Sequence, residues 1–179
     1  MTLDEFWNFI ERSRRGAEDD DELVDNLRAR LEKLPAEEVA EWGRIFNSRL
    51  NEAFRWDLWA VADIMHQGNC GVDSFEDWRG WLISKGRKHF ERALLNPESA
   101  AYRVNLDDQI YNEDILRVAH GVYEEKTGEP DIPDDPWILY GCGNDAYPSG
   151  TELSNSQLIE RFPKLCAKFE YEPPKENGA

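Results

Sequence analysis

The stretch FRWDLWAVADIMHQGNCGVDSFEDWRGWLI, residues 54–83, contains four of the seven tryptophans in the chain. In its first half the apolar residues recur every three or four positions, which is the spacing of an amphipathic helix. Gly68, Asn69 and Gly71 then indicate a loop, and Ser74 is expected to cap a second helix with the same spacing. The stretch therefore predicts two helices that pack against each other mainly through their tryptophans.

Helical spacing continues on both sides of this stretch, whereas no run alternates β-branched and polar residues over the length of a strand, apart from the short segment 137–140. Thr2 and Glu5 form a capping box at the start of the first helix. The sequence predicts an all-α fold, an irregular multi-helix bundle with a long loop, Gly128–Gly150, before the C-terminal helix. Outside the central stretch, helices are expected over Leu3 to Arg15, Leu23 to Leu31, Pro35 to Phe54 and Glu113 to Lys126. A final helix is expected to begin after a cap at Ser154 or Asn155 and to reach Phe169, with a kink at Pro163.

The chain length of 179 residues fits one domain, and the 12% aromatic content compensates for a modest 40% of hydrophobic residues. We expect residues 1–171 to form a single helical domain and residues 172–179 to be a disordered tail. No apolar run approaches the roughly 18 residues of a membrane helix, and the first fifteen residues lack the basic start and apolar segment of a signal peptide. A soluble, cytoplasmic protein is therefore expected.

The charge of the chain is strongly acidic, because 37 Asp and Glu residues face 21 Lys and Arg residues and give a net charge of -16. Such a charge repels the phosphates of nucleic acids and anionic lipid head groups. Direct binding of nucleic acid or of a membrane is therefore disfavoured, and a protein partner with a basic surface is favoured. The same charge also keeps a protein in solution, so it does not by itself establish a partner.

The cysteines predict reduced thiols, because Cys70, Cys142 and Cys166 are odd in number and far apart. His66 stands four residues before Cys70, a spacing that permits metal ligation, but nothing supplies the other ligands at a familiar spacing, so no metal or cofactor is expected. Cys142 lies between two glycines and is a candidate nucleophile to which the sequence assigns no histidine. The common phosphate-binding, hydrolase and metalloprotease motifs are absent from the sequence.

The charged residues of the central stretch have two interpretations. Asp57 can lie beside Arg55 or Arg79, and in the functional interpretation Arg79 anchors a site for an anion or a carboxylate. In the structural interpretation Asp57 and Arg79 form a partly buried ion pair that joins two helices, which we favour. His66 is expected at a helix C-terminus, where it meets the negative end of the helix dipole.

The tryptophans also divide into two groups. Trp42, Trp56, Trp59 and Trp81 lie on apolar helix faces and are expected in the core. Trp78 shares the inward face of its helix with Phe75 and Trp81, but Trp78 and Trp137 can instead be exposed anchors, because tryptophan is over-represented in binding hot spots. Asp63 and Glu76 are expected to be solvated charges on helix faces. No catalytic residue is assigned, and the candidate binding residues are Arg55, Asp57, His66, Trp78, Arg79 and Trp137.

Several short motifs together resemble an uncharacterised bacterial family, a domain of unknown function of about this length. The motifs are Phe6-Trp7, the RWDLW run of residues 55–59, the FxxWRGWLI segment of residues 75–83 with Gly86 after it, and Phe162-Pro163-Lys164-Leu165. The resemblance covers most of residues 1–126 and resumes at the final helix. Trp78 stands where we expect Phe or Tyr, and residues 128–150 look particular to this chain. The resemblance implies a soluble bacterial protein and supplies no activity and no catalytic residues.

Two hypotheses of function from different classes remain at this point. The first is an acidic helical module that binds a protein partner, as an immunity or inhibitor protein does when its acidic face covers the basic active site of an enzyme such as a nuclease. The second is an enzyme or a small-molecule-binding protein with a pocket around Arg55, Asp57, His66 and Arg79. A passive structural domain of a larger assembly is a third, and the oligomeric state stays open.

Overall fold

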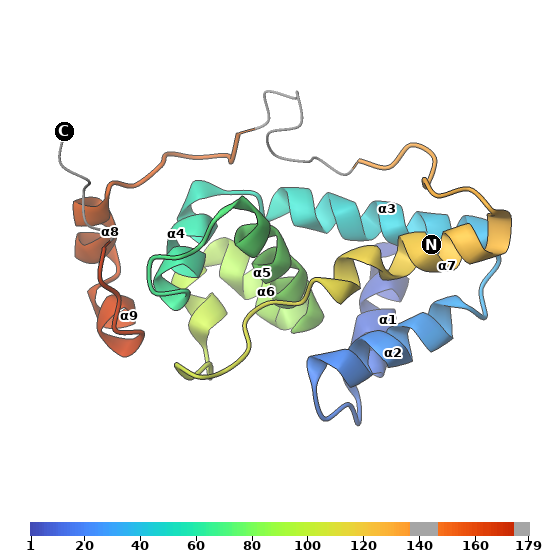
Figure 1. Ribbon diagram of the computed structural model, residues 1–179, viewed down its shortest axis with the longest axis horizontal. Coiled ribbons are helices and arrows are strands. Elements are labelled where there is room, and N and C mark those ends of the chain that lie inside the picture. Colours follow the sequence, from blue (N-terminus) through green and yellow to red (C-terminus); the bar gives the residue numbers. More distant parts are fainter. Residues whose placement is uncertain (137–146, 174–179) are drawn as a thin grey trace.

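The computed structural model describes residues 1–136 and 147–173, and these residues form helices and no strand, as the sequence predicts. Figure 1 shows α3 along the long axis of the molecule, with α7 beside it, α4 to α6 in the middle and α8 and α9 at one end. The elements are α1 Leu3–Arg14, α2 Asp20–Leu31, α3 Ala36–Glu52, α4 Trp56–Met65, α5 Val72–Ser84, α6 Arg87–Leu95, the 3₁₀ helix η1 Pro97–Ala101, α7 Asp114–Thr127, α8 Asn155–Arg161 and α9 Pro163–Lys168.

Local capping sets most of the helix ends. The predicted capping box is present, because the Glu5 amide donates to the Thr2 hydroxyl over 3.2 Å and the Thr2 amide donates to the Glu5 carboxylate over 2.7 Å. Ser154 caps α8 in the same way. Gly128 ends α7 with a φ of 79°, a left-handed conformation that glycine adopts without strain.

The start of α5 differs from the prediction, because the helix begins at Val72 with Gly71 as its N-cap, and Ser74 lies inside the first turn. The preceding loop is held by Cys70, whose amide donates to the Asp63 carboxylate over 3.1 Å. The Cys70 carbonyl accepts from the Trp59 indole over 2.9 Å. With Cys70 fixed at both backbone groups, the chain turns into the helix directly after it.

A row of aromatic rings forms the predicted joint between α4 and α5. Trp56 stacks on Trp59 with ring centres 5.4 Å apart, and Trp59 stacks on Phe75 at 4.6 Å. The row continues along α5, from Phe75 to Trp78 and from Trp78 to Trp81, at 5.9 Å in both cases. Such offset contacts add to the stability that each ring contributes by burial.

The central helix of the bundle is α5, which contacts α3, α4, α6 and α7. Because these helices cover it from several directions, Trp78 is 0% exposed, and its interpretation as an exposed anchor is wrong. At Gly80 a Cβ atom would lie 2.9 Å from the Asn112 carbonyl and 3.1 Å from Ile115, so only glycine permits the start of α7 to approach α5 this closely. Trp137, the other candidate anchor, lies outside the described residues.

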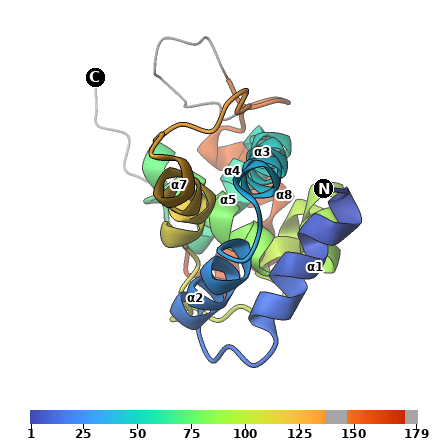
Figure 2. The ribbon, with the colours of Figure 1, turned by 90° about the vertical axis from the view of Figure 1, so that its right-hand side faces the viewer.

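Residues 128–136 return along α3, which lies side by side with α7 in Figure 2. The Asn47 amide donates to both oxygens of Asp135, over 2.7 and 2.8 Å. Asp135 also lies 2.8 Å from the Nε2 atom of His120 on α7. The Asp135 carboxylate therefore ties this returning segment to both helices.

The C-terminal segment, residues 147–173, packs against the start and the side of α4. The Trp56 amide donates to the Ser149 carbonyl over 3.0 Å, and the Ser149 amide donates to the Phe54 carbonyl over 2.9 Å. Near the end of the segment, the Tyr171 hydroxyl donates to the Asp63 carboxylate over 3.2 Å. The segment is thus attached to α4 at two separate places.

Candidate functional site

Arg79 is a buried cation at the centre of the bundle, only 3% exposed. Its guanidinium lies 4.8 Å from the ring centre of Phe54 and 5.1 Å from that of Phe75. It donates to the Leu50 carbonyl over 3.0 Å, in the last turn of α3, where the helix dipole is negative. Glu76 lies 4.0 Å away. Burial lowers the pKa of Arg79 to about 10, so the side chain is charged at neutral pH.

The expected ion pair between Asp57 and Arg79 is wrong, because Asp57 pairs with Arg55. The Arg55 guanidinium donates to both Asp57 oxygens, over 3.0 and 2.6 Å, and to the Leu94 carbonyl over 2.9 Å. Arg55 is the N-cap of α4 and Asp57 lies in its first turn, so the two side chains meet locally. Arg79 faces the end of α3 instead.

The four residues of the pocket hypothesis do not line one hollow. Arg55 and Asp57 line a hollow of about 460 Å³ together with residues 149–151, Leu153 and Arg161. His66 lies at the opposite end of α4, where it is the C-cap and its Nδ1 atom bonds the Ala62 carbonyl over 2.8 Å. This position confirms the expected role of His66 at a helix C-terminus.

Asp63 is not the solvated charge that we expected, because it accepts hydrogen bonds from the Cys70 amide and the Tyr171 hydroxyl. Burial raises the pKa of Asp63, and burial with the nearby Asp63 charge raises the pKa of Tyr171 to about 12. Burial likewise raises the pKa of the Cys70 thiol, so this cysteine is a poor nucleophile. Cys142 lies outside the described residues. Within residues 1–136 and 147–173, no three His, Cys, Asp or Glu side chains are grouped as metal ligands.

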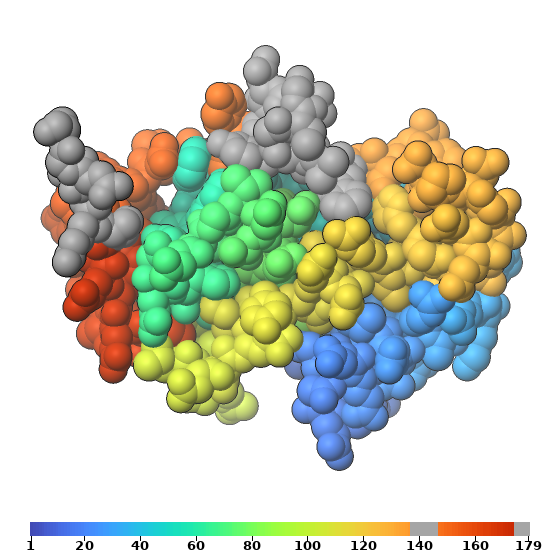
Figure 3. Space-filling model, viewed as in Figure 1, coloured from blue at the N-terminus to red at the C-terminus, as the bar shows by residue number. Residues whose placement is uncertain are grey.

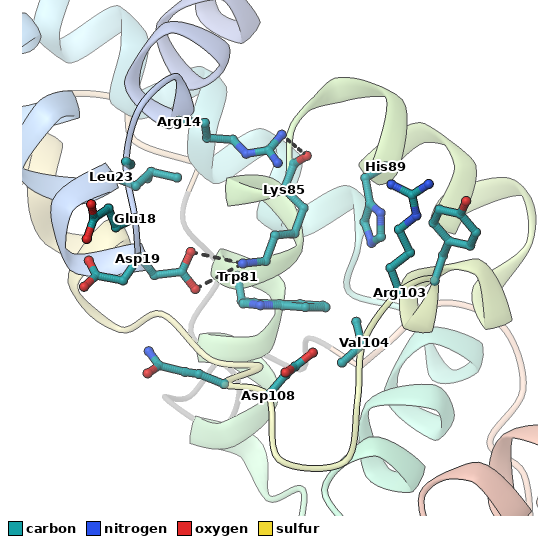
Figure 4. Close-up of a pocket in the computed structure, with 14 residues that line it drawn as sticks. Arg14, Glu18, Asp19, Leu23, Trp81, Lys85, His89, Arg103, Val104 and Asp108 are labelled. Atoms are coloured by element: carbon teal, nitrogen blue, oxygen red, sulfur yellow. Dashed lines mark hydrogen bonds and ion pairs between the residues drawn. The ribbon is translucent and has the colours of Figure 1, made fainter.

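A cleft of about 630 Å³ lies between residues 14–20 and residues 102–109. Figure 3 shows it as the notch between the blue and the yellow-green atoms. Trp81, Lys85 and His89 line it from α5 and α6, as the close-up in Figure 4 shows. The sequence alone does not indicate this cleft, because its lining comes from segments that are far apart in the chain and carry no shared motif.

Two of the polar groups that line the cleft, Lys85 and His89, are already engaged. The Lys85 ammonium lies 3.0 Å from the Asp20 carboxylate and 5.2 Å from the ring centre of Trp81. The Nε2 atom of His89 bonds the Ala100 carbonyl over 3.0 Å. Burial lowers the pKa of His89, so its imidazole is neutral at pH 7. The cleft is therefore better suited to contact a bound group than to transfer protons.

Four carboxylates gather where the first turns of α5 meet the start of α7, and we call them the Asp77 cluster: Asp73, Glu76, Asp77 and Glu113. The Asn112 amide donates to the Asp77 carbonyl over 3.2 Å, which brings the start of α7 to α5. Burial raises the pKa of Asp77 to about 6, and the charges of Glu113, Glu76 and Asp73 add to this effect. The sequence shows Asp73 and Asp77 on one helix face, but not that Glu113 joins them.

Some of the cations of the chain are engaged by its own carboxylates. Ion pairs within the described residues involve nine Lys or Arg side chains, among them Arg117, which lies 3.2 Å from Glu113. Because these cations are already paired, they do not neutralise the remaining carboxylates, and the surface keeps a net negative charge.

The fold and these surfaces define an all-α domain with an acidic exterior and a buried aromatic centre. The chain belongs to the DUF4240 family, described as proteins of unknown function, whose family model matches residues 1–125. This match confirms the family resemblance of the RWDLW and FxxWRGWLI motifs. The matched range ends within α7, so the Phe162–Leu165 motif lies beyond it.

Searches of curated proteins and of solved structures gave no match. Among the described residues, none of the helices combines the length and the apolar character that crossing a membrane requires.

Proposed function

We propose that this chain is an acidic, helical protein-binding module that covers a basic surface of a protein partner, in the manner of an immunity or inhibitor protein. The observation that carries the proposal is the Asp77 cluster, in which two helices from distant parts of the chain bring four carboxylates together. A partner with lysine or arginine side chains at the matching positions would neutralise this charge.

The Asp77 cluster has the surroundings of a protein-binding surface. Val72, at the start of α5, is 38% exposed, and Tyr111, next to Asn112, is 52% exposed. Exposed apolar and aromatic side chains beside charged ones are the usual composition of an interface, in which the aromatic groups supply buried area and the charges supply specificity. Glu113 and Arg117 form an exposed ion pair at the edge, which contributes little to stability.

The net charge of -16 would attract a basic partner before the two proteins touch. Opposite charges on two proteins steer their encounter and raise the association rate, and added salt screens this attraction over roughly 10 Å. An inhibitor that must reach its target quickly benefits from such steering. The pocket hypothesis gains no support from the geometry, because His66 and Arg79 do not line the hollow beside Arg55 and Asp57.

The experiment uses three immobilised baits with a lysate of the organism that produces the protein, and mass spectrometry identifies and quantifies what each bait retains. The first bait is the unchanged chain. The second carries Asp73→Asn, Asp77→Asn and Glu113→Gln. The third removes the same number of charges at exposed positions of α7, its following turn and α8, through Glu124→Gln, Glu129→Gln and Glu160→Gln.

The expected result is a basic protein retained by the first and third baits and lost from the second. Its affinity for the unchanged chain should fall as the salt concentration rises. If the second bait retains the same proteins as the first, or if the affinity does not change with salt, the proposal is overturned.

A further inference from the structure

A hollow of about 370 Å³ with basic walls lies between the end of α6, the residues around η1 and the helix α9. Two arginines and two lysines line it, and Glu98 is the acidic residue of its lining. We call it the basic hollow; its cations are Arg92, Arg103, Lys164 and Lys168. In a chain of net charge -16, a local concentration of positive charge opposes the overall field and needs its own explanation.

The cations of the basic hollow are not used in ion pairs within the part of the chain that the structure describes, unlike the nine paired cations elsewhere. Lys168 donates to the Ala101 carbonyl over 2.9 Å and lies 5.1 Å from the ring centre of Phe169, and neither contact neutralises its charge. Like charges that share a small hollow repel one another, so bringing them together has a cost that a bound anion would offset.

The two arginines are arranged around Tyr102, which is 54% exposed. The guanidinium carbons of Arg92 and Arg103 lie 5.9 and 5.1 Å from the centre of its ring. Arg103 has a φ of 61°, in the left-handed region that residues with side chains rarely adopt. An unfavourable backbone conformation thus occurs at Arg103, which supplies one of the charges of the basic hollow.

We propose that the basic hollow binds a small anion that carries two or more phosphate groups. An arginine guanidinium presents paired N–H donors that match two oxygens of one phosphate, and lysine adds a point charge. Arg92 and Arg103 come from α6 and the segment after η1, and Lys164 and Lys168 come from α9, so an anion in the hollow can contact both groups. A volume of about 370 Å³ suits a small ligand rather than a macromolecule.

This site is separate from the surface of the proposed function. The Asp77 cluster belongs to α5 and α7, whereas the basic hollow belongs to α6, η1 and α9, and none of its cations touches the four carboxylates by an ion pair within the described residues. Lys164 and Lys168 also lie beyond the residues matched by the family model, which end at 125. One proposal can therefore fail without the other.

The test is isothermal titration calorimetry of the full chain with tripolyphosphate, at low and at physiological ionic strength. One variant carries Lys164→Gln and Lys168→Gln, and a second carries Arg92→Gln and Arg103→Gln. A control variant carries Lys33→Gln and Lys126→Gln, which removes two exposed cations in other parts of the surface. Because the hollow's arginines and lysines are exposed, thermal unfolding should show that all variants fold.

Tripolyphosphate should bind the unchanged chain, and each variant of the basic hollow should bind it at least about tenfold more weakly, the usual effect of losing charge-assisted hydrogen bonds. The control variant should bind with an affinity within about twofold of that of the unchanged chain, since neither Lys33 nor Lys126 lines the basic hollow. Absence of binding to the unchanged chain, or an equal loss in the control variant, would overturn the proposal. A parallel titration with ATP shows whether a nucleoside strengthens binding, and affinity at least equal to that of tripolyphosphate is the expected result. ATP binding that the hollow variants leave unchanged would contradict the assignment.

Discussion

The Arg79 guanidinium donates to the Leu50 carbonyl over 3.0 Å and so joins the central helix α5 to the last turn of α3. The contact is buried, and the guanidinium lies beside the rings of Phe54 and Phe75. It replaces the ion pair with Asp57 that the sequence suggested. Arg79 therefore acts in the interior, as a charged cap of α3 rather than as a contact for a ligand.

Replacement of Arg79 by alanine should destabilise the protein by about 3 kcal/mol, because it leaves the Leu50 carbonyl without this donor and opens a void beside the rings of Phe54 and Phe75. Urea denaturation followed by tryptophan fluorescence measures the change. Arg55→Ala is the matched control, since it also removes a donor to a backbone carbonyl, that of Leu94, but from a partly exposed side chain, and it should cost only about 1 kcal/mol. Equal losses for the two variants would show that Arg79 has no special structural role.

Asp135 should make stability depend on pH through His120. The hydrogen bond and charge of Asp135 raise the pKa of His120 above its ordinary value. A raised pKa in the folded state means that the stabilisation is complete below about pH 6.5 and is lost as the pH rises through the folded pKa. Asp135→Asn should therefore destabilise the protein more at pH 6 than at pH 9, by about 1.5 kcal/mol for a charge-assisted bond. The urea midpoints of both proteins at both pH values measure this, and an equal loss at pH 6 and pH 9 would contradict the pairing.

Asp77 should make the folded protein less stable as the pH rises, whereas a carboxylate in an ion pair makes it more stable. Its pKa is raised from 3.8 to about 6, so the folded state holds its proton more tightly and loses stability as the pH rises from about 4 to about 6. Asp77→Asn removes this loss and should stabilise the protein at pH 7.5 by about 1 kcal/mol, since solvent still screens a partly buried group. At pH 3.5, where the carboxyl is protonated in both states, the variant should match the unchanged chain. A destabilised variant at pH 7.5 would contradict the repulsion within the Asp77 cluster.

Removal of the Tyr171 hydroxyl should loosen the C-terminal segment without disturbing the rest of the bundle. Tyr171→Phe deletes one hydrogen bond to Asp63 and should cost about 1 kcal/mol. Hydrogen exchange followed by mass spectrometry should show faster exchange in residues 147–173 and unchanged exchange in α3 and α5. Faster exchange throughout the chain would mean that the segment is part of the cooperative core.

The helices themselves could be predicted from the sequence, because their signals are local. Thr2 and Glu5 cap α1 as expected, Leu23, Leu27 and Leu31 line the buried face of α2, and Gly128 ends α7. Each of these signals depends on residues within one or two helical turns.

The partners of the charged residues could not be predicted, because tertiary packing decides them. Asp57 stands two residues from Arg55 and twenty-two from Arg79, and the sequence permits either pair; the direction in which α5 presents Arg79 selects Leu50 instead. The sequence permits Trp78 to be buried or to be an exposed anchor, because its motif alone does not reveal how many helices surround α5. The Asp77 cluster and the basic hollow likewise depend on the meeting of distant segments.

The most direct test of the central proposal is the association rate between the unchanged chain and the basic protein that it retains, measured by stopped-flow fluorescence over a range of salt concentrations. Electrostatic steering predicts a rate that falls by about tenfold or more between low and high salt. It also predicts a slower and less salt-dependent rate for the chain with Asp73→Asn, Asp77→Asn and Glu113→Gln. A rate that is the same at every salt concentration, or the same for both chains, would contradict an acidic binding surface at the Asp77 cluster.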